Sequence, residues 1–179
     1  GIGEDLVHDA AAQGLRVTSF RPSVIFGPGD SFFNRFGALL KNIPVAFPLA
    51  CPEALFAPVY VGDVAAAFAK ALIAPASIGQ RYALCGPTIY TLRELVDYTA
   101  QTLGLRRQII GLSPALSSLQ AYVFEFMPGK PFSRDNYWSL QKNSVCTDAF
   151  PVLFGITPAS IEAIVPGYLA RRTHRARYD

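Results

Sequence analysis

Residues 21–30 of the chain read R-P-S-V-I-F-G-P-G-D, and this stretch decides the expected fold. It follows V-T-S-F at residues 17–20, which predicts a short β-strand that ends at Arg21. Pro22 removes a backbone donor and fixes its own φ angle, and the Gly-Pro-Gly at 27–29 favours a sharp turn. We therefore predict a strand that delivers a tight loop to the carboxyl edge of a sheet, where open α/β proteins bind their ligands.

Helical patterns flank this stretch on both sides. Residues 1–12 repeat apolar side chains at helical spacing, and residues 31–42 do so again, with Ser31 in the position of an N-cap. Residues 64–74 are almost wholly apolar, which predicts a helix that is buried on most sides. Asp63 precedes that run, and we expect its carboxylate to cap the helix rather than to take part in catalysis.

The second half of the chain is predicted to be mostly helical. Before it, residues 79–87 form one more strand pattern, bounded by glycine and proline. Thr91 and Glu94 then form a capping box, in which each side chain satisfies a free backbone N–H at the start of a helix. Helical spacing returns over residues 114–126 and 133–141. The order of elements favours a mixed α/β lobe followed by a helical one.

Four segments together resemble a known family. They read R-P-S-V-I-F-G-P-G-D at 21–30, F-A-P-V-Y-V-G-D-V-A at 56–65, G-Q-R-Y-A-L-C-G-P at 79–87 and Y-T-L-R-E-L-V at 90–96. In order and spacing they are similar to the second half of extended short-chain dehydrogenases/reductases of the epimerase/dehydratase type. The resemblance implies an α/β fold, the C-terminal portion of a Rossmann-type doubly wound sheet plus a mostly helical substrate lobe.

The resemblance also implies which parts of the whole protein this chain holds. The family carries its catalytic Tyr-x-x-x-Lys on the helix that residues 1–12 resemble, followed closely by a Gly-Glu pair like the one at 3–4. In that register the chain begins just after the catalytic Lys and lacks the glycine-rich loop. We therefore expect no catalytic residue in this chain, and we expect the chain alone to be inactive. Residues 1–87 would be the remainder of the NAD(P)-binding domain, with 27–55 crossing into the substrate lobe. Residues 88–179 would be the mostly helical substrate lobe.

Candidate cofactor contacts follow from the position of the turn. The family uses this turn to hold the nicotinamide ring of NAD or NADP, largely through main-chain contacts. The resemblance therefore implies cofactor contacts at Pro22, Ser23 and Ile25. Pro22 and Ile25 also fit a second interpretation, in which they are packing residues at the end of the strand.

Candidate substrate contacts lie at the start of the next helix. The family places contacts to its small-molecule substrate there, which implies Phe32, Asn34 and Arg35. Arg35 is suited to pair with an anionic group. It is equally suited to an exposed face of the helix, so both interpretations stand at this point.

A narrower resemblance favours a different function. Residues 26–36, 58–65 and 128–141 are similar to the atypical branch that includes the dehydrogenase-like accessory subunit of respiratory complex I and its bacterial relatives. That subunit keeps a bound nucleotide for structural reasons. The alternative is therefore a non-catalytic nucleotide-binding accessory or assembly protein, with a respiratory complex or a membrane surface as its partner.

The composition is apolar, with 51% hydrophobic and 16% charged residues. Membrane association would explain it, and so would a fragment whose missing half covers apolar surface; the resemblance favours the fragment. Such a surface also favours homo-oligomers. The sequence contains no run of about 18 apolar residues and no signal-peptide pattern, which predicts a cytoplasmic protein, at most peripheral to a membrane.

Charge and cysteine content argue against three further classes of protein. The net charge is only +3, and the basic residues at 171–177 are interpreted as a solvated terminus, so no nucleic-acid partner is expected. Cys51, Cys85 and Cys146 show no C-x-x-C spacing, and we interpret them as partly buried thiols in a reducing compartment. With only two histidines, far apart in sequence, no metal site is expected.

Overall fold

The computed structural model describes residues 2–125 and 134–170. The basic tail and the first part of the 128–141 segment lie outside these described residues. The helices are α1 (Ile2–Asp9), α2 (Phe33–Asn42), α3 (Val61–Ile73), α4 (Leu92–Thr102), α5 (Pro114–Glu125), α6 (Arg134–Leu140) and α7 (Ile161–Leu169), with short 3-10 turns η1 (Ala10–Gln13), η2 (Pro75–Ser77) and η3 (Val152–Phe154). The strands are β1 (Ser19–Pro22), β2 (Ile25–Phe26), β3 (Ala46–Leu49), β4 (Leu55–Phe56), β5 (Val59–Tyr60), β6 (Arg81–Leu84), β7 (Tyr90–Thr91) and β8 (Gln108–Gly111).

The strands pair mainly in parallel, which confirms the expected mixed α/β class. β1 pairs with β6 from Ser19↔Arg81 to Pro22↔Leu84, β2 pairs with β5, and β3 pairs with β8, all in parallel. Only β4 and β7 run antiparallel among the described strands. β1 is placed two residues later than the sequence predicted and ends on Pro22, a residue that has no N–H to extend the ladder.

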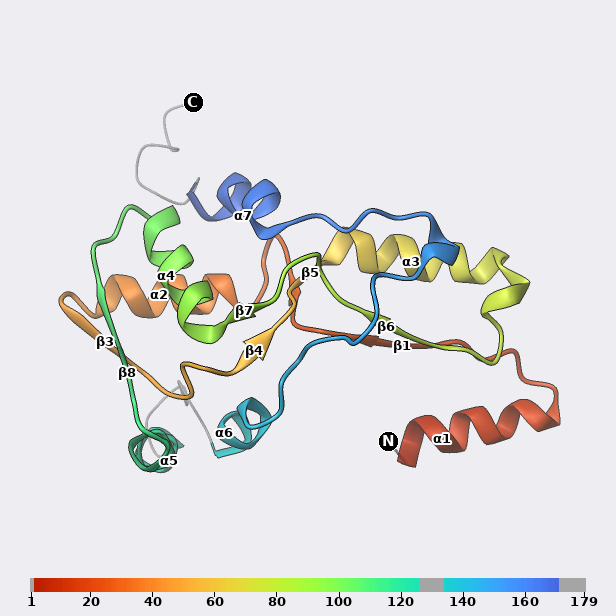
Figure 1. Cartoon of the computed structure of the whole chain (residues 1–179), viewed down its shortest axis with the longest axis horizontal. Coiled ribbons are helices and arrows are strands. Elements are labelled where there is room, and N and C mark those ends of the chain that lie inside the picture. Colours follow the sequence, from red (N-terminus) through yellow and green to blue (C-terminus); the bar gives the residue numbers. More distant parts are fainter. Residues whose placement is uncertain (1, 126–133, 171–179) are drawn as a thin grey trace.

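Helices α1 and α3 lie on opposite sides of the β1–β6 pair (Figure 1). α1 is held through its charged side, where Glu4 accepts two hydrogen bonds of 3.0 Å and one of 2.7 Å from the Arg21 guanidinium. Asp5 pairs with Arg81 at 2.6 Å. The apolar residues of the same helix, Ile2 and Leu6, are exposed. The helix was predicted correctly, but ion pairs rather than apolar packing attach it to the described part of the chain.

The Glu4–Arg21 pair makes a pH prediction. Hydrogen bonds from Arg21 hold the pKa of Glu4 down, from its ordinary 4.5 to about 2. Because the folded-state pKa is lowered, this attachment of α1 contributes fully above about pH 4.5 and is lost as the pH falls towards 2. NMR titration of the Glu4 carboxyl should show this low pKa, and Arg21→Ala should return it towards 4.5. A titration near 4.5 in the unmodified protein would contradict the ion pair.

Helix α3 corrects two predictions. Val64 and Ala67 are buried, but Leu72 is 88% exposed, so the helix is not buried on most sides. Asp63 is not a cap, because it lies inside the helix after the N-cap residue Tyr60. Its carboxylate instead accepts a hydrogen bond of 2.8 Å from the backbone N–H of Ala159, which ties the C-terminal segment to α3.

The larger core contains buried side chains from both halves of the sequence. Buried side chains from α2, β3 and β8 pack with those of α4 and α7, on the left of Figure 1. Phe33 of α2 is fully buried at its centre, with Phe26 of β2 at 5.8 Å and Tyr98 of α4 at 6.4 Å between ring centroids. A second, smaller cluster lies between α3, β6 and η3. The boundary between lobes near residue 87 stays a prediction.

The capping box at the start of α4 is confirmed. Thr91 Oγ1 accepts the Glu94 N–H at 3.1 Å, and Glu94 accepts the Thr91 N–H at 2.7 Å.

Thr91→Ala removes one half of this pair, and we expect it to lower the free energy of unfolding by about 1 kcal/mol. Urea denaturation measures the change. Thr157→Ala, at an exposed position before α7, is the matched control and should leave stability unchanged.

Candidate functional site

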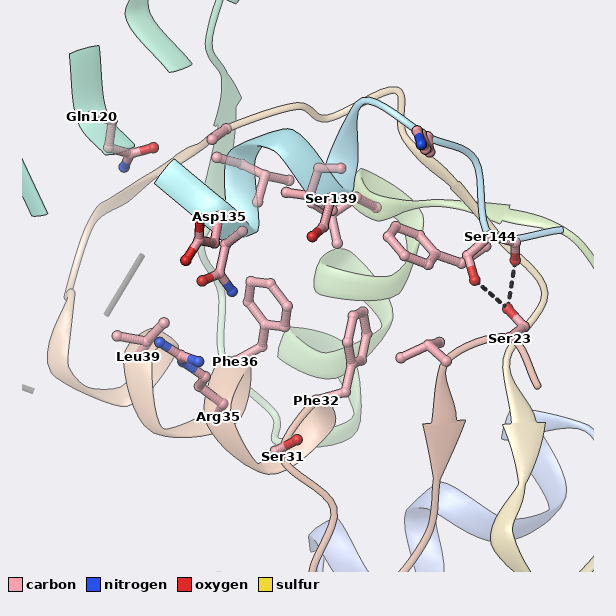
Figure 2. Close-up of a pocket in the computed structure, with 18 of the residues that line it drawn as sticks. Ser23, Ser31, Phe32, Arg35, Phe36, Leu39, Gln120, Asp135, Ser139 and Ser144 are labelled. Carbon is pink, nitrogen blue, oxygen red and sulfur yellow. Dashed lines mark hydrogen bonds between the residues drawn. The ribbon is translucent and has the colours of Figure 1, made fainter. Parts of the chain in front are cut away.

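One pocket of about 790 Å³ brings the predicted cofactor turn and the predicted substrate helix together. Pro22, Ser23 and Ile25 line one side of it, and α2 lines another through Phe32 and Arg35 (Figure 2). β3, β4, α6 and residues 142–144 contribute further walls. A pocket of this size is in the range that holds small organic ligands.

The walls of the pocket are mainly aromatic and aliphatic. Phe32 contacts Phe36 and Phe56 with ring centroids 5.2 and 5.9 Å apart, and Phe36 lies 6.4 Å from Phe47. Edge-to-face packing of this kind fixes the rings against one another. The apolar lining residues include Phe32, Phe36, Leu39, Phe47, Phe56 and Leu140. A bound molecule would therefore place apolar surface against these rings.

Polar groups lie at the opening of the pocket. Arg35 of α2 and Asp135 of α6 face each other across it, and Gln120 of α5 lies beyond them (Figure 2). Lys142 adds a second cation to the lining. The Gln120 side-chain amide donates to the Pro48 carbonyl at 3.2 Å, and this hydrogen bond holds it against β3. The opening thus offers charges of both signs around an apolar interior.

Ser23 is buried and uses its hydroxyl within the protein. Ser23 Oγ donates to the Ser144 carbonyl at 2.5 Å and accepts the Ala57 N–H at 3.3 Å. The Ser23 N–H donates to the Leu84 carbonyl at 2.9 Å. The turn is therefore fixed from β6 on one side and from the 142–146 segment on the other.

Asp30 holds the end of the turn against α2 and α7. It accepts the Gly27 N–H at 3.2 Å, the Asn34 N–H at 3.1 Å and the Tyr168 hydroxyl at 2.5 Å. Burial and the neighbouring carboxylate together raise the pKa of Tyr168, which stays a neutral donor. The prediction of Ser31 as N-cap is wrong: Phe32 occupies that position, and Asp30 binds the free helix N–H instead.

Five of the six predicted site residues line the pocket. The exception is Asn34, whose backbone N–H binds Asp30 and whose buried Nδ2 has no hydrogen-bond partner within the described residues. Arg35 is exposed at the opening. The ligand roles of all six residues stay predictions.

The sequence interpretation missed the residues after α5. Asp135, Ser139, Lys142 and Ser144 complete the pocket, although none of the four was named as a candidate site residue. No local pattern marks Ser144, because its position depends on a parallel bridge to Phe56, 88 residues earlier in the chain.

The interpretation of the cysteines as thiols needs correction. Cys85 and Cys146 form a disulfide, and only Cys51 keeps a free thiol. The two half-cystines are 61 residues apart in sequence. They meet because Ser144 hydrogen-bonds to Leu55 and Ala57, and the Ala57 carbonyl also accepts the N–H of Gly86, which follows Cys85. Residues 2–125 and 134–170 hold no group of three or more His, Cys, Asp or Glu side chains that could bind a metal ion. Within the same ranges no helix is long and apolar enough to cross a membrane.

Parallel strand pairs, flanking helices and a ligand-sized pocket at the strand-end turn define an α/β protein of the Rossmann type. The chain belongs to the 3-beta hydroxysteroid dehydrogenase/isomerase family, whose sequence model matches residues 2–95, or 94 of its 179 residues.

Curated relatives include subunit 9 of the NADH dehydrogenase (ubiquinone) 1 alpha subcomplex, a mitochondrial protein. The chain is 32% identical to the Mus musculus subunit over 97 residues, which is 54% of this chain and 25% of that protein. It is 29% identical to the Arabidopsis thaliana subunit over 136 residues, 73% of this chain and 34% of that protein. The chain thus spans about a quarter to a third of these relatives.

Solved structures show the same fold at lower identity. The dTDP-glucose 4,6-dehydratase DesIV of Streptomyces venezuelae, with NAD and TYD bound, matches with a TM-score of 0.65 at 16% identity. The match covers 99% of this chain and 51% of DesIV. RMD of Pseudomonas aeruginosa, complexed with NADPH, matches with a TM-score of 0.52 at 20% identity, over 60% of this chain and 40% of RMD.

Proposed function

We propose that these residues act as the C-terminal part of an NAD(P)-binding, dehydrogenase-like protein, in which the pocket is the place where the nicotinamide meets a second ligand. The observation that carries the proposal is the pocket itself. The turn at Pro22–Ile25 and the start of α2 come from separate elements, yet both face the same apolar space (Figure 2).

The residues present fit the nicotinamide end of a dinucleotide. Pro22 and Ile25 are exposed next to the pocket, so a flat ring can pack on them, while Ser23 is buried and stiffens the turn through Ser144 and Leu84. A bound NAD(P) supplies hydride transfer. Phe32 and Phe36 would position the apolar part of the second ligand and exclude water, and Arg35 would orient a polar group at the opening. The residue that moves a proton is proposed to lie in another part of the longer protein.

Binding of reduced nucleotides tests this proposal. NADH and NADPH are titrated into the full-length protein, and quenching of protein fluorescence is recorded, with the 179-residue chain as a parallel sample. We expect saturable binding by the full-length protein and neither binding nor turnover by the 179-residue chain. No binding by the full-length protein would overturn the dinucleotide role, and turnover by the 179-residue chain would overturn its assignment as a non-catalytic part.

A second candidate is a non-catalytic accessory protein of a respiratory complex. The similarity to the complex I subunit favours it. In that case the nucleotide stabilises the protein, and the partner is a respiratory complex at a membrane surface. The two candidates differ in turnover. Bound NADPH that no carbonyl substrate oxidises and bound NADP+ that no alcohol substrate reduces, together with co-purification of respiratory subunits, would favour the accessory role.

A further inference from the structure

The 142–146 segment, which we name the strap, forms one wall of the pocket. Ser144 lies beside β4 as a short parallel bridge to Phe56. The Ser144 N–H donates to the Leu55 carbonyl at 2.8 Å, and the Ala57 N–H donates to the Ser144 carbonyl at 3.0 Å. Lys142 and Ser144 both line the pocket. The strap therefore contacts Phe56, which is part of the pocket wall, and Ser23, which belongs to the turn.

Besides these bonds, Ser23 Oγ donates to the Ser144 carbonyl and Asn143 Oδ1 accepts the Leu55 N–H at 3.2 Å, but the strap buries little apolar surface. Within residues 142–149 only Ser144 and Cys146 are not exposed, and the next buried side chain is Phe150. A second pocket of about 280 Å³ lies between β6 and residues 148–153. Segments with few buried apolar contacts open locally at low free-energy cost. Noncovalent contacts alone would leave the strap among the least stable parts of the site.

The disulfide supplies the missing constraint. Cys146 follows Ser144 by two residues, and its sulfur is bonded to that of Cys85. Cys85 is 5% exposed and directly follows Leu84, whose carbonyl accepts the Ser23 N–H. The disulfide therefore attaches the strap to the end of β6, the same strand end that holds the Pro22–Ile25 turn. The strap also contacts this turn directly through the Ser23–Ser144 hydrogen bond (Figure 2).

We propose that the Cys85–Cys146 disulfide is a redox-controlled latch that keeps the strap over the pocket. Its functional consequence, control of ligand access, rests on the function proposed above. A dithiol, either a small molecule or a dithiol protein, opens the latch by exchange. Its thiolate attacks the more accessible sulfur, that of Cys146, and displaces the Cys85 thiolate. The second thiol then closes on the mixed disulfide, so both cysteines end as thiols and the dithiol as a disulfide, with two electrons transferred.

Hydrogen exchange tests the latch without any nucleotide. The full-length protein is compared oxidised and after reduction with dithiothreitol, with thiol alkylation and mass spectrometry to confirm the state of Cys85 and Cys146. The Ser144 and Ala57 amides, which bond across the strap, should exchange about tenfold faster or more after reduction. Amides of α4 should stay protected over the same minutes.

Two variants provide matched controls. The double variant Cys85→Ser/Cys146→Ser should exchange like the reduced protein and should not respond to dithiothreitol. Cys51→Ser, which removes the free thiol, should respond as the unmodified protein does. Equal exchange of Ser144 and Ala57 in both redox states would overturn the latch. Loss of protection in α4 together with the strap would also overturn it, because the disulfide would then hold the whole fold. Failure of NADPH to bind in either redox state would count against the proposed function, whereas the exchange data alone decide the latch.

Discussion

Replacement of Gly86 by alanine is expected to lower the free energy of unfolding by about 3 kcal/mol or more. A Cβ at this position would lie 1.8 Å from the Pro58 carbonyl oxygen and 2.9 Å from its carbon. Both atoms belong to a buried backbone, which cannot move aside as a flexible side chain would. Gly86 also donates its N–H to the Ala57 carbonyl at 3.1 Å, so the two chain segments must approach closely. Any shift that relieves the clash would separate β6 from the segment before β5.

Urea denaturation measures this change, with Gly167→Ala as the matched control. Gly167 lies inside α7, and a Cβ there would meet nothing within 4 Å. Alanine favours helix over glycine by up to about 1 kcal/mol, so this control should be neutral or stabilising. Equal effects of the two substitutions would show that the close approach at Gly86 does not exist.

Truncation of Phe33 to alanine is expected to cost about 3 to 5 kcal/mol of stability. The ring is fully buried, and it contacts Phe26, Phe32 and Tyr98. Removing it leaves a cavity where β2, α2 and α4 meet, and the neighbouring rings can fill that cavity only in part. Because Phe32 lies on the removed ring, the pocket wall should loosen as well.

The control for Phe33 is Leu72→Ala, which removes an apolar side chain that is 88% exposed on α3. Its expected change is within about 0.5 kcal/mol. Thermal or urea unfolding of both variants gives the comparison. A loss below about 1 kcal/mol for Phe33→Ala would show that this ring is not at the centre of the larger core.

Local chemistry explains what could be read from the sequence. The capping box at Thr91 and Glu94 needs only residues three apart, and it forms as expected. The strand at 81–84 and the helix at 33–42 follow from glycine and proline punctuation and from apolar spacing. The resemblance implied ligand contacts at the Pro22–Ile25 turn and at Phe32. These residues are close in sequence, and all of them line the pocket.

Long-range contacts explain what could not be read. Asp63 precedes an apolar run, a pattern that predicted a helix cap, but its partner is the N–H of Ala159, 96 residues away. Ser144 enters the site through a bridge to Phe56, and Cys146 through a bond to Cys85, and no local pattern encodes either. Leu72 and its neighbours read as buried because their run is apolar, yet the described residues leave them exposed.

The central claim is that the pocket between the Pro22–Ile25 turn and α2 is where a nicotinamide meets its second ligand. A crystal structure of the full-length protein with NADPH tests it most directly. We expect the nicotinamide ring in van der Waals contact with Pro22 or Ile25, with one face towards Phe32 and the pocket. A nucleotide bound elsewhere, with the turn empty and the pocket unchanged, would contradict it.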